Sequence, residues 1–207
     1  MIAFFHPFCD AMGGGEKVLF EAIKALQDEK EFENDTLLVY SGAEMSAEQL
    51  CKAIKDKFST QVNLKRNNLQ FVKLKTHETM QAENYPSCTL LWQLIAYNRV
   101  CAEALQLKPC DVFIDTIGVG FAYPLVKTLF GCKVVSYTHY PTISSDMIKQ
   151  IDTNQFNNQV AGNPILKMGK RIYYWGLMLA YGQCGRFADQ IATNSSWTDK
   201  HIRSLWD

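Results

Sequence analysis

Apolar positions along the chain gather in short runs that alternate with longer segments of helical period. Six runs rich in β-branched and aromatic residues predict strands at residues 2–5, 36–40, 69–74, 112–115, 133–137 and 190–193. The segments between and after them predict helices at residues 16–27, 46–58, 89–105, 121–130, 164–184 and 196–205. This order is typical of β-α-β units, so we expect an α/β fold with a Rossmann-like, doubly wound parallel sheet.

Serine residues mark the starts of two predicted helices. Ser46 lies three residues before Gln49, the spacing of a capping box, in which each side chain bonds to the backbone N–H of the other residue. Ser195 or Ser196 is placed to cap the last helix in the same way, because a serine oxygen can accept from the free N–H groups of the first turn.

The composition is that of a globular protein. The 207 residues include 21 basic and 21 acidic side chains, and 47% of the residues are hydrophobic, which excludes collagen-like, disordered and strongly nucleic-acid-binding classes. Seven cysteines without a C-x-x-C pair indicate reduced thiols and a cytosol-facing protein. Because the cysteines and histidines lack the spacing of metal ligands, we expect no metal site.

Three consecutive glycines lie where the first strand turns into the first helix. Gly13, Gly14 and Gly15 leave room for a ligand beside the backbone, and a helix N-terminus offers free N–H groups to an anion. The turn matches neither the G-x-G-x-x-G pattern nor a Walker loop, which argues against generic dinucleotide and ATP sites. A phosphate or diphosphate site and a plain flexible turn both remain open.

Two polar side chains stand at strand ends that should face a ligand crevice. His139 follows the fifth strand, where an imidazole can hydrogen-bond a sugar hydroxyl or a phosphate oxygen, although a lone histidine can also be structural. Asp115 ends the fourth strand, where it can accept hydrogen bonds from a polyol or cap the helical segment that follows.

Residues 163–187 combine basic and aromatic side chains without an acidic one. Lys167, Lys170 and Arg171 precede an aromatic and Leu/Met-rich middle that contains Trp175. Such a helix suits the headgroup interface of a membrane, and a core helix with solvated ends is the alternative. The longest apolar stretch, residues 172–184, is shorter than the roughly 20 residues that a spanning helix needs.

Four blocks of the sequence resemble one enzyme family. They are HPFCDAMGGGEKVL from residue 6, Asp115-Thr116, YTHYPTISSDM from residue 137 and NSSWT from residue 194. Together they resemble the N-terminal half of the asparagine-linked glycosylation α-1,2-mannosyltransferases, and the HYPTISxDM block is far more specific than the glycines. The resemblance implies that residues 1–207 form the Rossmann-like acceptor-side domain of a retaining GT-B glycosyltransferase.

This resemblance also implies a reaction and a location. The family's enzyme transfers mannose from GDP-mannose to Man3GlcNAc2 linked to dolichol diphosphate, adding the fourth and fifth mannoses without a metal or other cofactor. The implied location is the endoplasmic reticulum membrane, on its cytosolic face. The implied partners are GDP-mannose, the dolichol-diphosphate-linked oligosaccharide, the membrane surface and other mannosyltransferases of the pathway, and no nucleic acid.

Residue roles follow from the matched blocks and from charge. Gly13, Gly14 and Gly15 match the loop whose backbone contacts the donor diphosphate, and His139 matches the histidine that contacts the transferred sugar through a hydroxyl or through its own carbonyl. Further side chains expected to contact acceptor or sugar are His6, Asp115, Tyr140 and Asp146. Those expected to contact lipid or membrane are Lys167, Lys170, Arg171 and Trp175.

The sequence departs from the family in one respect. Relatives carry a nucleotide-sugar domain with two glutamates separated by seven residues, and here the only such pair is Glu21 and Glu29, on the first predicted helix. We therefore expect the chain to be incomplete and inactive alone. The alternatives are a noncatalytic subunit that binds a lipid-linked glycan or acts as a scaffold, and a GT-B transferase of other specificity.

Overall fold

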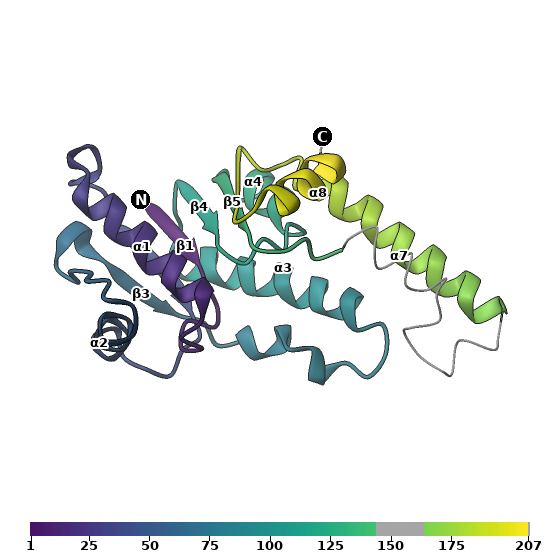
Figure 1. The fold of residues 1–207 in the computed structure, drawn as a ribbon, viewed down its shortest axis with the longest axis horizontal. Coiled ribbons are helices and arrows are strands. Elements are labelled where there is room, and N and C mark those ends of the chain that lie inside the picture. Colours follow the sequence, from purple (N-terminus) through teal and green to yellow (C-terminus); the bar gives the residue numbers. More distant parts are fainter. Residues whose placement is uncertain (144–163, 207) are drawn as a thin grey trace.

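A six-stranded parallel sheet forms the centre of the computed structural model, which describes residues 1–143 and 164–206 (Figure 1). The strands lie in the order β3-β2-β1-β4-β5-β6, and every neighbouring pair is parallel. Their bounds are β1 Ile2–Phe5, β2 Leu37–Ser41, β3 Gln70–Lys73, β4 Val112–Asp115, β5 Lys133–Thr138 and β6 Gln190–Thr193. The order reverses between β1 and β4, which confirms the doubly wound α/β prediction.

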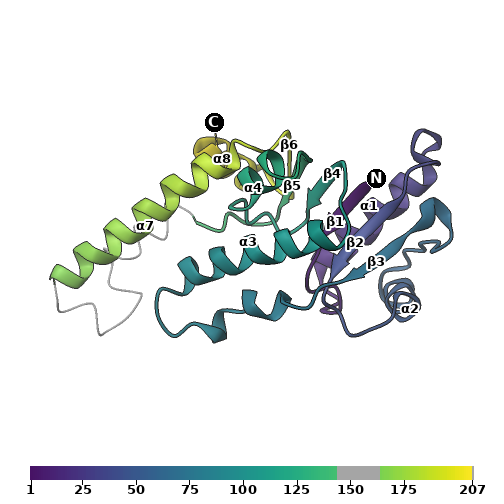
Figure 2. The ribbon, with the colours of Figure 1, turned by 180° about the vertical axis from the view of Figure 1, so that it is seen from behind.

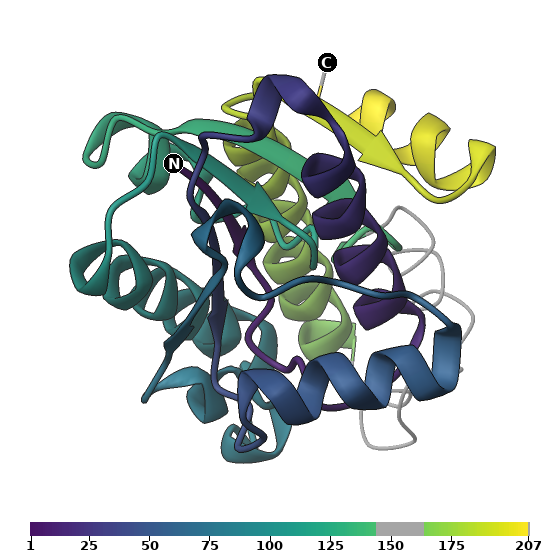
Figure 3. The same ribbon diagram turned by 90° about the vertical axis from the view of Figure 1, so that its left-hand side faces the viewer.

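Helices cover both faces of this sheet (Figure 3). The α-helices are α1 Gly14–Asp28, α2 Ala47–Phe58, α3 Thr89–Leu107, α4 Tyr123–Thr128, α7 Pro164–Gly185 and α8 Ser196–Trp206. Short 3₁₀ turns are η1 Lys30–Phe32, η2 Arg66–Asn68, η3 His77–Met80 and η4 Ala82–Asn84. One apolar cluster joins α1 and α2 to one sheet face, and a second joins α3, α4, α7 and α8 to the other.

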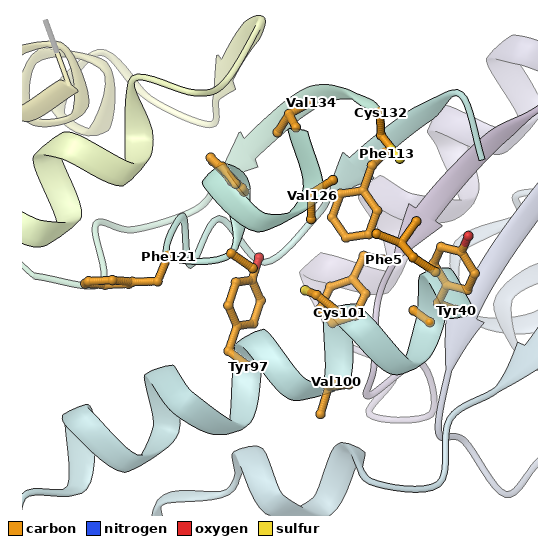
Figure 4. Packing of buried hydrophobic residues seen from close by; sticks show 14 of the residues in the cluster. Phe5, Tyr40, Tyr97, Val100, Cys101, Phe113, Phe121, Val126, Cys132 and Val134 are labelled. Atoms are coloured by element: carbon orange, nitrogen blue, oxygen red, sulfur yellow. The ribbon is translucent and has the colours of Figure 1, made fainter. Parts of the chain in front are cut away.

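Alternation along β1 shows how the sequence separates these two clusters. Phe4 belongs to the cluster beneath α1 and α2, whereas Phe5 points to the opposite face. There the Phe5 ring lies 5.4 Å from the Phe113 ring and 5.6 Å, edge to face, from the Tyr97 ring, centroid to centroid (Figure 4). This aromatic packing fixes α3 against the carboxyl half of β1 and β4.

The helix starts agree with the capping predictions, with one correction. The backbone N–H of Ser46 donates to Gln49 Oε1 at 2.8 Å, and Ser46 Oγ accepts from the Gln49 N–H at 3.3 Å, so the capping box is confirmed. Ser195 Oγ accepts from the backbone N–H of Thr198 at 3.2 Å and therefore caps α8. The first helix begins at Gly14, so two of the three glycines belong to its first turn and not to the loop before it.

Helix α7 packs on the sheet only through its carboxyl half, and its amino half extends away (Figures 1 and 2). The buried residues of α7 are Leu177, Tyr181, Gly182 and Gly185. The extended half exposes large apolar side chains, among them Ile172, which is 64% exposed, and Trp175. In the described part of the chain, no helix combines the length with the apolarity required to cross a bilayer.

Candidate functional site

A pocket of about 330 Å³ opens at the carboxyl edge of the sheet, beside the point where the strand order reverses between β1 and β4. Its lining residues are His6, Phe8, Ala11, Gly15, Glu16, Thr116, Ile117, His139 and Tyr140. The structure thus brings together four residues predicted as site residues, namely His6, Gly15, His139 and Tyr140. Pockets at such switch points are the usual ligand sites of open parallel sheets.

His6 is oriented by a hydrogen bond that fixes one of its protons. The Thr116 hydroxyl donates to the carbonyl of Phe5 at 2.8 Å, so its oxygen is left to accept from His6 Nδ1, 2.7 Å away. Nδ1 of His6 therefore carries a proton. The other ring nitrogen, Nε2, lies 3.4 Å from Glu16 Oε1.

Glu16 places a carboxylate inside the glycine turn. Its Oε2 accepts from the backbone N–H of Gly13 at 2.6 Å, so one of the donors expected for a phosphate already has a partner. Burial raises the pKa of Glu16, but hydrogen bonds from His6 and from backbone N–H groups outweigh burial and hold the pKa below its ordinary value. The remaining open part of the turn is at Gly14, where an added Cβ would meet nothing within 4 Å.

His139 presents a free imidazole nitrogen to the pocket wall. Among the residues that the structure describes, none forms a hydrogen bond with its buried Nε2 atom. A Cβ on Gly15 would lie 3.8 Å from this atom and 3.3 Å from His6 Cε1, so both imidazoles pack closely against the glycine. Burial and the nearby His6 lower the pKa of His139, which Glu16 raises only in part. We therefore expect a neutral ring at pH 7, able to donate or accept a single hydrogen bond at Nε2.

The backbone carbonyl of His139, the other group proposed for sugar contact, already has a partner. Thr198 Oγ1 donates to it at 3.2 Å and so links α8 to the end of β5. The next residue, Tyr140, is 54% exposed and its ring stacks on Trp197 of α8 with centroids 5.1 Å apart. The loop after β5 is thus held by α8, and the exposed Tyr140 ring forms part of the pocket wall.

Asp115 does not reach the pocket, which corrects the expectation that it contacts acceptor or sugar. Its side chain is 0% exposed. Oδ2 accepts from the hydroxyls of Tyr97 and Tyr123 at 2.7 and 2.8 Å, and Oδ1 accepts from the backbone N–H of Ile117 at 2.8 Å. The alternative of a cap for the helical segment beginning near Gly120 is also wrong, because the bonded N–H belongs to the turn directly after the strand.

The remaining predicted residues lie elsewhere. Asp146 falls outside the residues that the structure describes. Lys167, Lys170, Arg171 and Trp175 all belong to the extended half of α7, away from the pocket residues (Figure 1). Within residues 1–143 and 164–206, no group of three or more His, Cys, Asp or Glu side chains is arranged to hold a metal ion.

Sequence reasoning did not predict five lining residues of the pocket as site residues, namely Phe8, Ala11, Glu16, Thr116 and Ile117. Glu16 was treated as a helix residue, yet its position three residues after Gly13 is the N3 position from which a glutamate reaches back to the start of a helix. Ile117 lies in the I-G-V-G-F segment after β4, where glycines alternate with apolar residues. This alternation is a sequence signal that the prediction of strands and helices did not take into account.

Comparison with known proteins identifies relatives over the whole chain. Residues 1–206 match the family described as "ALG11 mannosyltransferase N-terminus". The "GDP-Man:Man(3)GlcNAc(2)-PP-Dol alpha-1,2-mannosyltransferases" of Mus musculus and Homo sapiens are each 39% identical over 211 residues, which cover 100% of this chain and 42% of the relative. The protein of the same name from Dictyostelium discoideum is 37% identical over 209 residues, 99% of this chain and 41% of the relative.

These matches define the extent of the similarity. The chain spans about two fifths of the length of the curated relatives it matches, since the covered shares are 42%, 42% and 41%. Its parallel sheet and the pocket at the sheet's switch point agree with the fold expected from the resemblance. The chain therefore belongs to the family described as the ALG11 mannosyltransferase N-terminus.

Proposed function

We propose that this chain forms the acceptor-side domain of a retaining GT-B α-1,2-mannosyltransferase. The enzyme transfers mannose from GDP-mannose to Man3GlcNAc2 linked to dolichol diphosphate, on the cytosolic face of the endoplasmic reticulum. The names of the relatives support the substrate. The observation that carries the proposal is the buried Nε2 of His139, which has no hydrogen-bond partner among the described residues and belongs to a side chain that lines the same pocket as the amino end of α1.

The pocket offers two kinds of group for this chemistry. Departure of GDP places negative charge on the diphosphate, and free backbone N–H groups in the first turn of α1 stabilise such charge, beginning at the open position of Gly14. The mannose carbon gains oxocarbenium character as the bond to phosphate breaks. A neutral His139 holds a mannose hydroxyl by a hydrogen bond and so orients the sugar, while His6 and Tyr140 complete the walls.

The extended half of α7 supplies the proposed contact with the membrane. Lys167, Lys170 and Arg171 place positive charge beside the exposed Trp175 and Ile172. Basic side chains attract anionic headgroups, and aromatic rings favour the interface between headgroups and acyl chains. The domain would then present its pocket to a lipid-linked acceptor at the membrane surface. We include no metal or cofactor in this proposal, and a chelator should leave transfer unchanged.

The test measures transfer of radiolabelled mannose from GDP-mannose to lipid-linked Man3GlcNAc2 by an enzyme of the relatives' length that contains this chain. We expect His139→Ala to lower kcat by about 10²-fold or more, since positioning groups of this kind carry such factors. The conservative variant His139→Asn retains a hydrogen-bonding side chain and should recover part of the rate. Turnover equal to wild type in both variants would make His139 structural. Acceptor binding without any transfer would favour a noncatalytic glycan-binding subunit.

A further inference from the structure

Two exposed aromatic side chains stand at the mouth of the pocket. Tyr140 is one of the lining residues and is also 54% exposed, so it marks the side on which the pocket opens. Its ring stacks on the ring of Trp197 in the first turn of α8, with 22° between the two planes. Trp197 is 41% exposed and lies outside the pocket lining. The pair therefore continues the wall of the pocket onto the outer surface of the domain.

Contacts within and around α8 hold both rings in place. The ring of His201, one turn after Trp197, lies 3.9 Å from the Trp197 ring, centroid to centroid, and His201 Nδ1 donates to the Trp197 carbonyl at 2.8 Å. Thr198 is 1% exposed, and its hydrogen bond to the carbonyl of His139 ties the residue before Tyr140 to α8. A ligand that binds this pair is therefore spared part of the entropy cost of ordering the two rings.

The chemistry of the exposed rings favours a sugar over an anion. The face of an aromatic ring carries partial negative charge, which repels a phosphate. The C–H groups of a pyranose ring are polarised by the neighbouring oxygens and carry partial positive charge, so they are attracted to the same face. Contact between the two surfaces also removes apolar area from water. A sugar ring can thus lie flat on this pair while the hydroxyl groups at its edge remain free to react.

The position of the pair indicates which sugar it receives. The proposed function places the transferred mannose beside His139, and the attacking hydroxyl must come within about 3–3.5 Å of the reacting carbon. The sugar that carries this hydroxyl therefore lies at the mouth of the pocket, where Tyr140 is the exposed part of the wall. The relatives are named for Man(3)GlcNAc(2)-PP-Dol, in which mannose residues form the end away from the lipid.

We propose that Tyr140 and Trp197 form an acceptor subsite that binds the terminal mannose of the glycan by stacking. The mannose that accepts the new sugar packs at Tyr140, and Trp197 extends the contact toward the rest of the glycan. The dolichol diphosphate lies beyond the glycan, outside this subsite. This inference rests on the proposed function, because it assigns the glycan part of the acceptor to a surface of this domain.

A second stacked pair supplies a matched control. Tyr85 and Trp92 also stack, with 17° between their planes, and Trp92 is 48% exposed. Trp92 follows Leu91 of α3, which lines an apolar groove of about 460 Å³ between α3 and α7. This groove shares no lining residue with the pocket. Trp92→Ala thus removes the same kind of side chain, with a similar exposure, at a distance from the proposed subsite.

The first test measures binding of the free oligosaccharide Man3GlcNAc2, without lipid, by titration calorimetry with the enzyme of the relatives' length. We expect Trp197→Ala to weaken binding by about three- to tenfold, the contribution of one aromatic contact. Trp197→Phe keeps an aromatic face and should recover most of the affinity, and Trp92→Ala should bind like the wild type. The disaccharide GlcNAc2, which lacks mannose, should bind more weakly than Man3GlcNAc2 and should not respond to Trp197→Ala.

The second test measures mannose transfer to lipid-linked Man3GlcNAc2. Trp197→Ala should raise the KM for the acceptor by the same factor and leave the KM for GDP-mannose unchanged. A merely structural tryptophan would not separate the two KM values. The proposal would be overturned by wild-type affinity for Man3GlcNAc2 in Trp197→Ala, or by an equal loss of affinity in Trp92→Ala.

A contact between Trp197 and the remainder of the longer enzyme is the competing explanation. In that case Trp197→Ala would raise both KM values together and would lower the melting temperature of the longer enzyme but not that of the 207-residue chain. This result would also overturn the subsite.

The two tests keep this inference distinct from the proposed function. Binding of Man3GlcNAc2 that depends on Trp197, without any mannose transfer, would refute the mannosyltransferase and leave the glycan subsite intact. Mannose transfer at equal acceptor KM in wild type and Trp197→Ala would refute the subsite and leave the mannosyltransferase intact.

Discussion

Replacing Asp115 by alanine tests whether this carboxylate supports the fold or the ligand. In the structure it accepts three hydrogen bonds within the core, from the Tyr97 and Tyr123 hydroxyls and from the Ile117 N–H. Removing it leaves these three donors without their acceptor in a region closed to water. In the wild type the two tyrosine hydroxyls remain protonated donors, because burial and then the charge of Asp115 hold their pKa values well above the ordinary range.

The expected loss of stability follows from these contacts. A hydrogen bond to a charged group contributes about 1.5–3 kcal/mol, so three independent ones would contribute about 4–9 kcal/mol. Tyr123 keeps a second contact with Ser136 Oγ at 2.7 Å, which limits its loss. We therefore expect Asp115→Ala to lower the free energy of unfolding by about 3–5 kcal/mol, a large share of the 5–15 kcal/mol typical of native proteins.

Urea unfolding followed by circular dichroism measures this change. Tyr97→Phe serves as the smaller comparison, because it removes one of the three hydrogen bonds to the carboxylate and should cost about 1.5–3 kcal/mol. A loss of less than about 1 kcal/mol in the free energy of unfolding of Asp115→Ala, together with weakened binding of Man3GlcNAc2, would refute the structural role. It would indicate instead that Asp115 contacts the ligand.

Three further substitutions separate folding from binding. Gly14→Ala should raise the free energy of unfolding by about 0.5–1 kcal/mol, because the added Cβ meets open space in a helical turn. The same variant should raise the KM for GDP-mannose. An unchanged KM would show that the turn does not take part in donor binding. Gly118→Ala should lower the free energy of unfolding, measured with urea, by at least about 1–2 kcal/mol, since the φ of Gly118 is +73° and an added Cβ would lie 2.7 Å from the Cα of Thr138. An unchanged free energy of unfolding would contradict this conformation of the segment.

Glu16→Gln should alter the dependence of stability on pH. The carboxyl has a lower pKa in the folded protein than its ordinary value of 4.5, so its contribution is complete above that value and is lost as the pH falls through the folded pKa. The melting temperature of the wild type should therefore fall more steeply than that of the variant between about pH 5 and pH 3. Parallel curves would show that the contact with His6 and Gly13 adds nothing to stability.

The hydrophobic pattern predicted the strands closely because each run is short, apolar and bounded by polar residues. The strands at residues 2–5, 112–115 and 190–193 coincide with β1, β4 and β6. β5 ends one residue later than predicted, and β2 and β3 each differ by one residue at both ends. The helices were less exact: α1 begins two residues early because the side chain of Glu16 caps it, and α4 is shorter than the predicted 121–130.

The residues of the site were predicted in part, and the wrong prediction for Asp115 has a physical reason. Position at a strand end placed His139 at the pocket, but the same argument failed for Asp115. Residues two apart in a strand share a face, so Asp115 faces the same core as Phe113 under α3. The groove lined by α3 and α7 could not be predicted, because these helices come together only in the folded protein.

The carboxylate of Glu16 makes the glycine turn a site with a built-in competitor. An anion that also uses the N–H of Gly13 must displace the Glu16 carboxylate, and the displaced group remains tethered next to the same donor at high effective concentration. Free phosphate, which brings few other contacts, competes poorly under these conditions. A sugar nucleotide that also reaches His139 gains a second attachment, so the turn favours the complete ligand over its fragments.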